Sequence, residues 1–397
     1  MKDFKIWVVA LVAMCGLNSC SEDCYHDFIE HDYTQELLGA WSVLGPESAE
    51  TMVFKADGTV ECTSVHEAEF FESTARYELS NNRMKLVWDD GTTDEGRLNV
   101  VKGSSFSLVV DEGTGAGYYF QYCHDDFSDE IVGSWLVQDE VSHQVWSYHA
   151  DGTADCKKFY YVSASESFMP GTYKVVGDIL FDTYQFDEET TVSYGARISF
   201  TPDGSVMKNT ALYAEEDGVE EYVMDYLHIK PTPDLAGMEY AYSDCPITNV
   251  IGYEEEVGLM GRTLNFYNLE NWVLATILNE IFCQVDFPDA DHFHCSSFHA
   301  PIAVEGHQMT VKMSEVVPTF KDVVFYTFQS ADSNQLHLCM DKAAFVNFFT
   351  NMQCMYLDDT DEQFDIADAD AVDAIYNTFN NTLLFIKVNL VMEKNAE

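Results

Sequence analysis

The sequence predicts a mainly β protein made of small antiparallel up-and-down barrels in tandem, the C-terminal one decorated with helices. Three observations predict this: one pattern recurs with a fixed offset, turn dipeptides such as Asp-Gly and Asn-Asn punctuate the chain, and Tyr, Phe, Val and Thr abound. The recurring stretches are GAWSVLGPESAETMVFKADGTVEC at 39–62 and GSWLVQDEVSHQVWSYHADGTADC at 133–156. Identical residues stand 94 positions apart, namely Gly39, Trp41, Asp57, Gly58, Thr59 and Cys62 against Gly133, Trp135, Asp151, Gly152, Thr153 and Cys156.

Length and composition fit several folded domains. The 397 residues suffice for two or three domains, and 47% hydrophobic with 14% aromatic residues supply their cores. Lys and Arg number 20 against 68 Asp and Glu, a formal charge of −48. Nucleic acids and anionic membrane surfaces are bound by basic faces, so this composition excludes both as ligands. A solvated acidic surface is the simplest interpretation, with calcium binding as the other.

The N-terminus carries the pattern of an export signal. Lys2 and Lys5 precede an apolar run at 6–17. A bilayer span needs ~20 apolar residues, so we interpret residues 1–19 as a signal peptide and not as a membrane anchor.

The residues around Cys20 add a localisation. The stretch LNSC at 17–20 resembles a bacterial lipobox, although Asn18 stands where a small residue is usual, and SED at 21–23 resembles the acidic surface-export signal of Bacteroidota lipoproteins. The resemblance implies a lipidated Cys20 on a tether at 20–33, with the chain anchored in the outer membrane and facing the cell surface. Ordinary signal cleavage beside an incidental cysteine is the alternative.

Each repeat contains about eight short strands joined by tight turns. Asp57-Gly58 predicts a type I′ hairpin, and Asn81-Asn82 a second turn. The first repeat predicts strands over 41–43, 52–54, 60–62, 75–79, 84–88, 98–101, 106–110 and 118–122. The second predicts them near 135 and over 145–149, 153–162, 172–176, 179–184, 191–200, 205–213 and 222–229. Closing each set into a barrel removes its sheet edges, so barrels are expected over 34–125 and 126–232.

These motifs resemble a known family. Trp41 and Trp135 each complete the G-x-W of a lipocalin first strand, and the Asp-Gly-Thr hairpin follows at the same distance in both copies. From 34 to about 230 the chain resembles the lipocalin-like domains of Bacteroidota lipoproteins. The resemblance implies that each tryptophan closes the floor of its barrel. It also implies that Arg97 and Arg197 stack on these tryptophans, with exposed arginines as the alternative.

A third domain is expected over 233–397, after the linker KPTPD at 230–234. Helical spacing places Leu274, Ile277, Leu278 and Ile281 on one face, with Asn268 as N-cap, and two further helical patterns lie around 343–352 and 372–379. Hairpin patterns at 298–313 and 322–340, and an alternating last strand with Leu384, Ile386, Val388, Leu390 and Met392 on one face, predict a third barrel decorated by helices.

The cysteines favour buried thiols over disulfides. Nine of the eleven remain after Cys15 and Cys20 are set aside, so at least one is unpaired in an exported chain. Cys62 and Cys156 occupy equivalent repeat positions and therefore belong to different domains, which makes them poor partners for each other.

Clusters of metal-binding residue types occur at three places. His292, His294 and His299 could converge from a strand, with Cys295 pointing away, but an exposed loop is the simpler interpretation. The stretch CYHDFIEHDY at 24–33 fits a tether. The aspartates of DIADADAVD at 365–373 lack the glycine and glutamate of an EF-hand and fit a helix start.

The sequence favours a non-catalytic binding or interaction scaffold. It contains no G-x-S-x-G, H-E-x-x-H or phosphate-binding glycine loop, and we expect no catalytic residue, cofactor or bound metal. The expected partner is a small apolar ligand, a glycan or a protein. Short strands build barrels that side chains largely fill, which favours recognition on the outer surface. The alternative is a metal-dependent enzyme with its site near His292 and His294.

Overall fold

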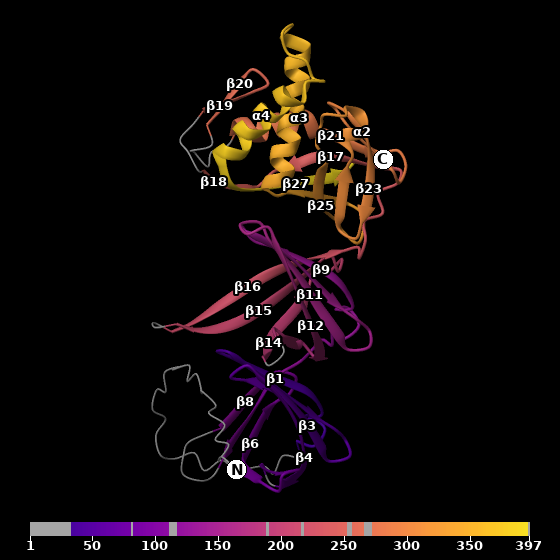
Figure 1. Ribbon diagram of the computed structural model, residues 1–397. Helices are drawn as coiled ribbons and strands as arrows, with labels where there is room; N and C mark the ends of the chain where they lie inside the picture. Colours follow the sequence, from indigo (N-terminus) through magenta and orange to yellow (C-terminus); the bar gives the residue numbers. More distant parts are fainter. Residues whose placement is uncertain are drawn as a thin grey trace, which may run out of the picture.

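The computed structural model describes residues 33–80, 82–110, 117–187, 190–215, 218–251, 256–265 and 272–395. The predicted signal peptide, Cys20, most of the predicted tether and Asn268 lie outside the described residues. Figure 1 shows three bodies in a row, with the first repeat at one end, the second in the middle and the C-terminal region at the other end. Among the described residues, no helix has the length and apolar character needed to cross a bilayer.

The first repeat forms a closed barrel, called barrel 1 here, of eight antiparallel strands in chain order. Its strands are β1 (Gly39–Gly45), β2 (Ser48–Phe54), β3 (Thr59–His66), β4 (Glu69–Ser80), β5 (Arg83–Trp88), β6 (Thr93–Val101), β7 (Ser105–Val110) and β8 (Gly117–Tyr122). The ring closes where Trp41 of β1 pairs with Tyr122 of β8. The predicted up-and-down barrel is confirmed.

The second repeat forms barrel 2 with the same number of strands and the same order. Its strands are β9 (Gly133–Gln138), β10 (Ser142–Tyr148), β11 (Thr153–Tyr160), β12 (Ser165–Val176), β13 (Ile179–Gln185), β14 (Thr191–Phe200), β15 (Val206–Glu215) and β16 (Gly218–Ile229). This ring closes where Trp135 of β9 pairs with His228 of β16.

The two repeat tryptophans occupy equivalent buried sites. Both indoles are completely buried. Trp41 Nε1 donates to the Leu37 carbonyl at 2.7 Å, and Trp135 Nε1 donates to the Ile131 carbonyl, also four residues earlier, at 2.8 Å. Burial and this shared contact give both tryptophans the same structural environment in their barrels.

The arginine stacking implied by the resemblance is wrong. Arg97 and Arg197 each precede an inward-facing residue, so their side chains point outward. Arg97 is exposed, and Arg197 forms an ion pair with Asp178 at 3.0 Å. The ring that stacks on Trp135 is instead that of His228, at 4.4 Å between centroids.

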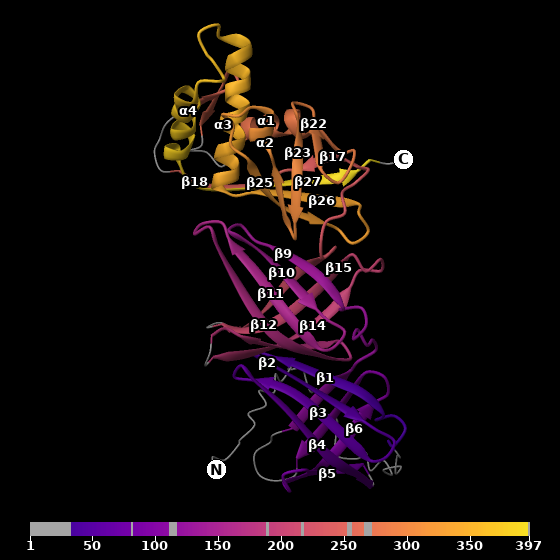
Figure 2. The ribbon, with the colours of Figure 1, turned by 45° about the vertical axis from the view of Figure 1, so that its right-hand side comes forward.

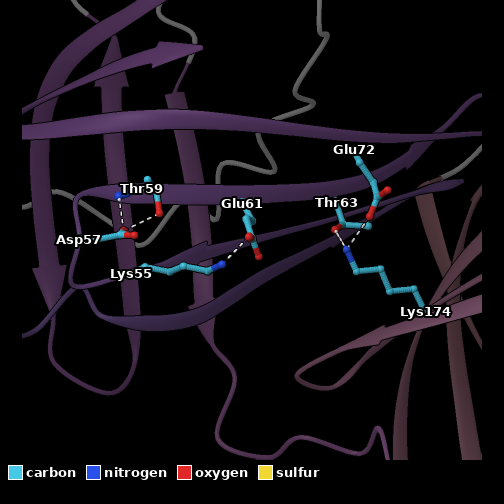
Figure 3. Close-up of polar contacts among 7 residues, drawn as sticks. All are labelled: Lys55, Asp57, Thr59, Glu61, Thr63, Glu72 and Lys174. Carbon is cyan, nitrogen blue, oxygen red and sulfur yellow. Dashed lines mark hydrogen bonds and ion pairs between the residues drawn. The ribbon is translucent and has the colours of Figure 1, made fainter. Parts of the chain in front are cut away.

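The Asp-Gly-Thr motif builds a hairpin, but not the type I′ turn that the sequence suggests. Only Gly58 has a positive φ, +82°, and its amide donates to the Lys55 carbonyl. This is a type I turn followed by a left-handed glycine, the three-residue hairpin loop. The Asp57 carboxylate accepts the backbone N–H of Thr59 at 3.0 Å and its hydroxyl at 2.6 Å (Figure 3). Asp151 holds Thr153 in the same way, so this motif is repeated for its turn.

The C-terminal region forms a third ring that also closes. Its elements are β17 (Met238–Asp244), β18 (Ile247–Ile251), β19 (Glu256–Leu259), β20 (Arg262–Asn265), α1 (Trp272–Phe282), β21 (Gln284–Phe287), β22 (His292–Cys295), β23 (His299–Glu305), β24 (Gln308–Val311), α2 (Met313–Val316), β25 (Val323–Gln329), β26 (Gln335–Met340), α3 (Lys342–Thr360), α4 (Ala369–Thr382) and β27 (Leu383–Lys394). Eight strands from β17 through β21–β27 follow one another, and β27 pairs back onto β17, while β18 extends the sheet beside β27.

The helices of the third domain pack into its sheet core. The predicted inward face of α1 is confirmed, because Leu274, Ile277, Leu278 and Ile281 are all buried. Phe348 of α3 stacks on Phe282 of α1 at 5.2 Å. The helices therefore share one buried core with the strands, and α3 and α4 lie on the side away from barrel 2 (Figure 1).

One position of the last strand differs from the sequence pattern. Leu384 was expected on the inner face, but its side chain is 63% exposed. A register shift between β18 and β27 skips this residue, since Val250 pairs with Phe385 and Ile251 with Leu383. Beyond the bulge, Ile386, Val388, Leu390 and Met392 face inward and are buried as predicted.

Barrel 1 packs side by side against barrel 2. Ala49, Val65, Ile179 and Phe181 form a buried apolar cluster from the outward faces of the two walls. At its edge, Lys174 of barrel 2 reaches Glu72 of barrel 1 at 2.6 Å (Figure 3).

The third domain packs against another part of the outer wall of barrel 2, which lies between its two neighbours (Figure 2). Leu136, Val145 and Phe159 of barrel 2 meet Phe328 and Phe385 in one buried cluster. Beside it, the buried Lys387 ammonium donates to the carbonyls of Asp139 and Ser142. Because both neighbours contact outward-facing residues, neither enters the interior of barrel 2.

Candidate functional site

The predicted histidine cluster separates into two groups. His292 Nδ1 lies 2.9 Å from Asp289 and 3.0 Å from Asp291, and these three exposed residues are the one group among the described residues close enough to share a metal ion. Hydrogen bonds that His292 donates to both carboxylates raise its pKa, although all three groups are open to solvent. The arrangement is that of an exposed acidic turn.

His294 and His299 face each other across neighbouring strands. Their ring centroids are 4.1 Å apart, and His294 Nδ1 lies 3.1 Å from Asp286. Cys295 is buried on the opposite face, as the strand alternation predicted. The structure thus brings together two of the three histidines and leaves His292 with its own carboxylates.

The other sequence candidates within the described residues have structural roles, whereas residues 24–32 of the CYHDFIEHDY stretch lie outside them. Asp368 caps α4 by accepting the amide of Asp370 at 3.0 Å, which confirms the helix start predicted for the aspartate run. All eight cysteines of the described residues are free thiols, seven of them buried. Cys62 and Cys156 lie in separate barrels, so the expectation of buried thiols holds for this part of the chain.

Inward-facing polar residues form a band inside barrel 1. Asp94 accepts the indole N–H of Trp88 at 2.6 Å and the hydroxyl of Tyr118 at 3.1 Å. Glu50 accepts from the Cys62 thiol at 3.4 Å, and burial raises the pKa of this carboxyl to about 7. Both carboxyl groups of this band therefore have donors within the protein.

Barrel 2 has a corresponding band with a different residue at its centre. Tyr77 and Tyr173 are equivalent, since their hydroxyls donate to the Lys55 and His149 carbonyls at 2.8 and 2.9 Å. Tyr77 pairs across the sheet with Leu86, and Tyr173 pairs with Asp182. A carboxyl group in barrel 2 thus replaces an inward leucine of barrel 1.

Burial dominates the electrostatics of Asp182. Its residue is 7% exposed, and burial raises the pKa of the carboxyl to about 8, with a hydrogen bond from Tyr148 at 3.3 Å acting in the opposite direction. Burial and the nearby Asp182 charge also raise the pKa of Tyr184 and Tyr226. In the ligand-free barrel the carboxyl is therefore mostly protonated at neutral pH.

Three polar atoms of this band make no hydrogen bond of standard geometry with the described residues, although the Tyr184 hydroxyl lies near that of Tyr148. They are Trp146 Nε1, Asp182 Oδ1 and the Tyr184 hydroxyl, all buried atoms on inward-facing side chains. The Trp146 and Tyr184 rings meet edge to face at 5.0 Å, and Tyr148 joins Asp182 to the same group. The described inward-facing residues of barrel 1 contain no such atom.

Unpaired buried polar atoms are rare because each costs about 1–3 kcal/mol. Three on neighbouring side chains of one barrel are therefore groups that a molecule with both donor and acceptor groups can satisfy. Trp146 itself is partly exposed although its Nε1 atom is buried, so the band reaches the accessible part of the barrel. We call Trp146, Asp182 and Tyr184 the barrel-2 site.

Sequence reasoning missed the barrel-2 site, although one signal was present. In ILFDTYQ at 179–185, Leu180, Asp182 and Tyr184 alternate with outward residues. An acidic residue on the apolar face of a strand is unusual enough to mark a candidate. That Trp146 from another strand completes the group required the closed barrel.

No protein-family model and no curated protein matches the chain. Among solved structures, similarity was found to the Cpx pathway activator NlpE from Escherichia coli, with 11% identity over 47% of this chain and 91% of that chain and a TM-score of 0.18. A porin-like protein from Bacteroides uniformis shows 10% identity over 49% of this chain and 96% of that one, with a TM-score of 0.14. Similarity at this level carries no information about function.

Proposed function

We propose that this chain is a lipid-anchored, surface-exposed protein of the outer membrane that binds a small ligand inside barrel 2 and catalyses no reaction. The observation that supports it is the set of three unpartnered buried atoms in the barrel-2 site. The short strands expected from the sequence favoured the outer surface for recognition, but the strands of barrel 2 are 6 to 12 residues long. The unpartnered atoms give a specific reason to place a ligand in the interior instead.

The domain arrangement supports binding. Barrel 2 is held by its outer wall on two sides. The buried cluster that contains Ala49 joins it to barrel 1, and the buried cluster that contains Phe328 joins it to the third domain. Fixing the wall fixes the strands from which the three side chains project, and a rigid site loses less entropy when it binds.

The anchoring part of the proposal is tested by Cys20→Ala. We expect the variant to leave the membrane fraction and to lose its lipid by mass spectrometry. Alanine at Glu22 and Asp23 is expected to retain the lipid and lower the surface-exposed fraction. A Cys20→Ala chain that stays membrane-bound, or processing insensitive to globomycin, contradicts the anchoring.

The binding part is tested by a fragment screen that follows the Trp146 indole N–H signal by NMR. Binders are expected to shift this signal in the protein and in a Glu50→Gln control, and to lose the effect in Asp182→Leu. A screen without any binder at this signal contradicts interior binding. Stoichiometric zinc in the purified protein that disappears in His292→Ala and His294→Ala would favour the metal-enzyme alternative.

A further inference from the structure

We propose that the barrel-2 site takes a small protonated amine with a neighbouring oxygen, the chemistry of an amino alcohol or an amino sugar. This inference rests on the proposed function and adds the ligand class to it. It follows from the hydrogen-bond inventory of the three unpartnered atoms, from the charge around Asp182 and from a comparison with barrel 1.

The inventory requires both a donor and an acceptor on the ligand. An indole N–H only donates, an ionised carboxylate only accepts, and a phenol hydroxyl does either. The ligand must therefore present an acceptor to Trp146 Nε1 and a donor to Asp182 Oδ1, with Tyr184 joining either group. A molecule with donors alone, such as a simple alkylamine, would leave the indole N–H unsatisfied.

The charge distribution favours a cationic donor. Within the described residues Asp182 takes part in no ion pair, and Tyr148 is its one hydrogen-bond donor. Buried carboxylates are stable when paired with a cation. A ligand ammonium would supply that cation and would lie beside the Trp146 and Tyr184 rings, whose faces attract positive charge. The formal charge of −48 also raises the local concentration of cations.

Barrel 1 shows why the inference concerns barrel 2 alone. The Asp94 carboxylate already receives two donors, from Trp88 and Tyr118, and Glu50 receives one from Cys62. A ligand amine there would have to displace hydrogen bonds that exist. In barrel 2 it would add bonds that are missing.

Binding at neutral pH is coupled to proton release. Asp182 is protonated in the free barrel below pH about 8, so each ammonium that binds its carboxylate releases one proton to solvent. The titratable groups that face Asp182 are neutral over this range, because burial raises the pKa of each: Tyr148, Cys156, Tyr173, Tyr184 and Tyr226. Affinity is therefore expected to rise about tenfold per pH unit up to pH about 8. It is expected to fall again near pH ~10, where an amine loses its proton.

The experiment compares three probes of nearly equal size by titration calorimetry and by the Trp146 indole signal on the purified full chain. Ethanolamine carries the ammonium and the oxygen, propylamine lacks the oxygen, and ethylene glycol lacks the charge. We expect ethanolamine to bind at least tenfold more tightly than ethylene glycol and several-fold more tightly than propylamine. At pH 6.5, the binding enthalpies measured in two buffers with different ionisation enthalpies should differ by the amount expected for about one proton released per ethanolamine bound.

Variants test the assigned roles. Asp182→Asn keeps the shape and removes the charge, so it should weaken ethanolamine at least tenfold and abolish the proton release. Trp146→Phe removes the indole donor and should reduce the preference for ethanolamine over propylamine. Glu50→Gln in barrel 1 is the matched control and should change neither. Protection of Cys156 from thiol reagents verifies that each variant keeps barrel 2 folded.

The outcomes separate this inference from the proposed function. Ethylene glycol binding at the Trp146 signal as tightly as ethanolamine, with no proton release, overturns the amine and leaves interior binding standing. Absence of any shift with all three probes, together with an empty fragment screen, overturns interior binding itself. Unchanged ethanolamine affinity in a folded Asp182→Asn variant overturns the role of the carboxylate.

Discussion

Replacing Asp182 by leucine should stabilise barrel 2, and increasingly so as pH rises. The carboxyl has a pKa of about 8 in the folded barrel against a usual value of 3.8. Between these values the unfolded chain is ionised while the folded barrel keeps its proton, so folding stability falls as pH increases. The loss is absent below pH ~3.8 and, at about 1.4 kcal/mol per pH unit, reaches about 5 kcal/mol at pH 7.5.

Leucine is the matched replacement because barrel 1 carries the fully buried Leu86 at the equivalent position. The Tyr148 hydroxyl loses its acceptor in the variant, which costs about 1–3 kcal/mol. The expected net gain at pH 7.5 is therefore about 2–4 kcal/mol. At pH 4 the variant should have no advantage, since the carboxyl then contributes little to the pH dependence.

Pulsed thiol labelling in urea measures each barrel separately. Cys156 is buried inside barrel 2 and Cys62 inside barrel 1, so their labelling reports the unfolding of their own barrels. The Cys156 midpoint should shift upward in Asp182→Leu at pH 7.5, while the Cys62 midpoint stays unchanged. A variant that retains the pH slope of the unsubstituted protein between pH 5 and 7.5 refutes the assignment of a protonated, buried Asp182.

Three further predictions concern the cores and the contact with the third domain. Trp41→Ala and Trp135→Ala should each destabilise the host barrel by ~3–5 kcal/mol and leave the other barrel unchanged in the same labelling assay. Lys387→Met removes the donor to two backbone carbonyls of barrel 2 and so weakens the contact between barrel 2 and the third domain. A protease should then cut the linker at 230–234 faster. An unchanged cutting rate in a folded variant argues against this contact. Burial lowers the pKa of His143 to about 3, so the folded protein keeps this imidazole neutral while the unfolded chain protonates it below pH ~6.5. The free energy of unfolding should therefore decrease as pH falls below ~6.5, by about 2 kcal/mol at pH 5. His143→Phe should flatten this part of the urea-unfolding profile, and an unchanged profile would show that His143 does not cause it.

The repeat pattern alone predicted most of the fold. The family resemblance placed Trp41 and Trp135 inside the barrels, where both are buried, and the fixed offset of the two copies predicted two barrels of the same design. The third domain was predicted by the same local rules, with a 3.6-residue period for α1 and a two-residue period for β27. Local sequence determines which face of an element is apolar, because the backbone geometry fixes the direction of each side chain.

Positions where the local rules gave the wrong result have tertiary causes. Leu384 was expected inside and points out because a bulge against β18 skips it. Arg197 was expected beside Trp135 and instead pairs with Asp178 at the contact between the barrels. A pattern within one strand contains no information about the strand or domain that packs against it.

The candidate site depended most on the tertiary structure. The sequence by itself determined that Asp182 lies on the inner face of its strand, next to Tyr184 on the same face. Only the closed barrel placed Trp146 beside them and showed that three of their buried atoms lack partners, whereas the Asp94 carboxylate of barrel 1 has two donors. Whether a buried polar atom is satisfied depends on distances between residues far apart in the chain, and those distances are set by how the strands close and pack.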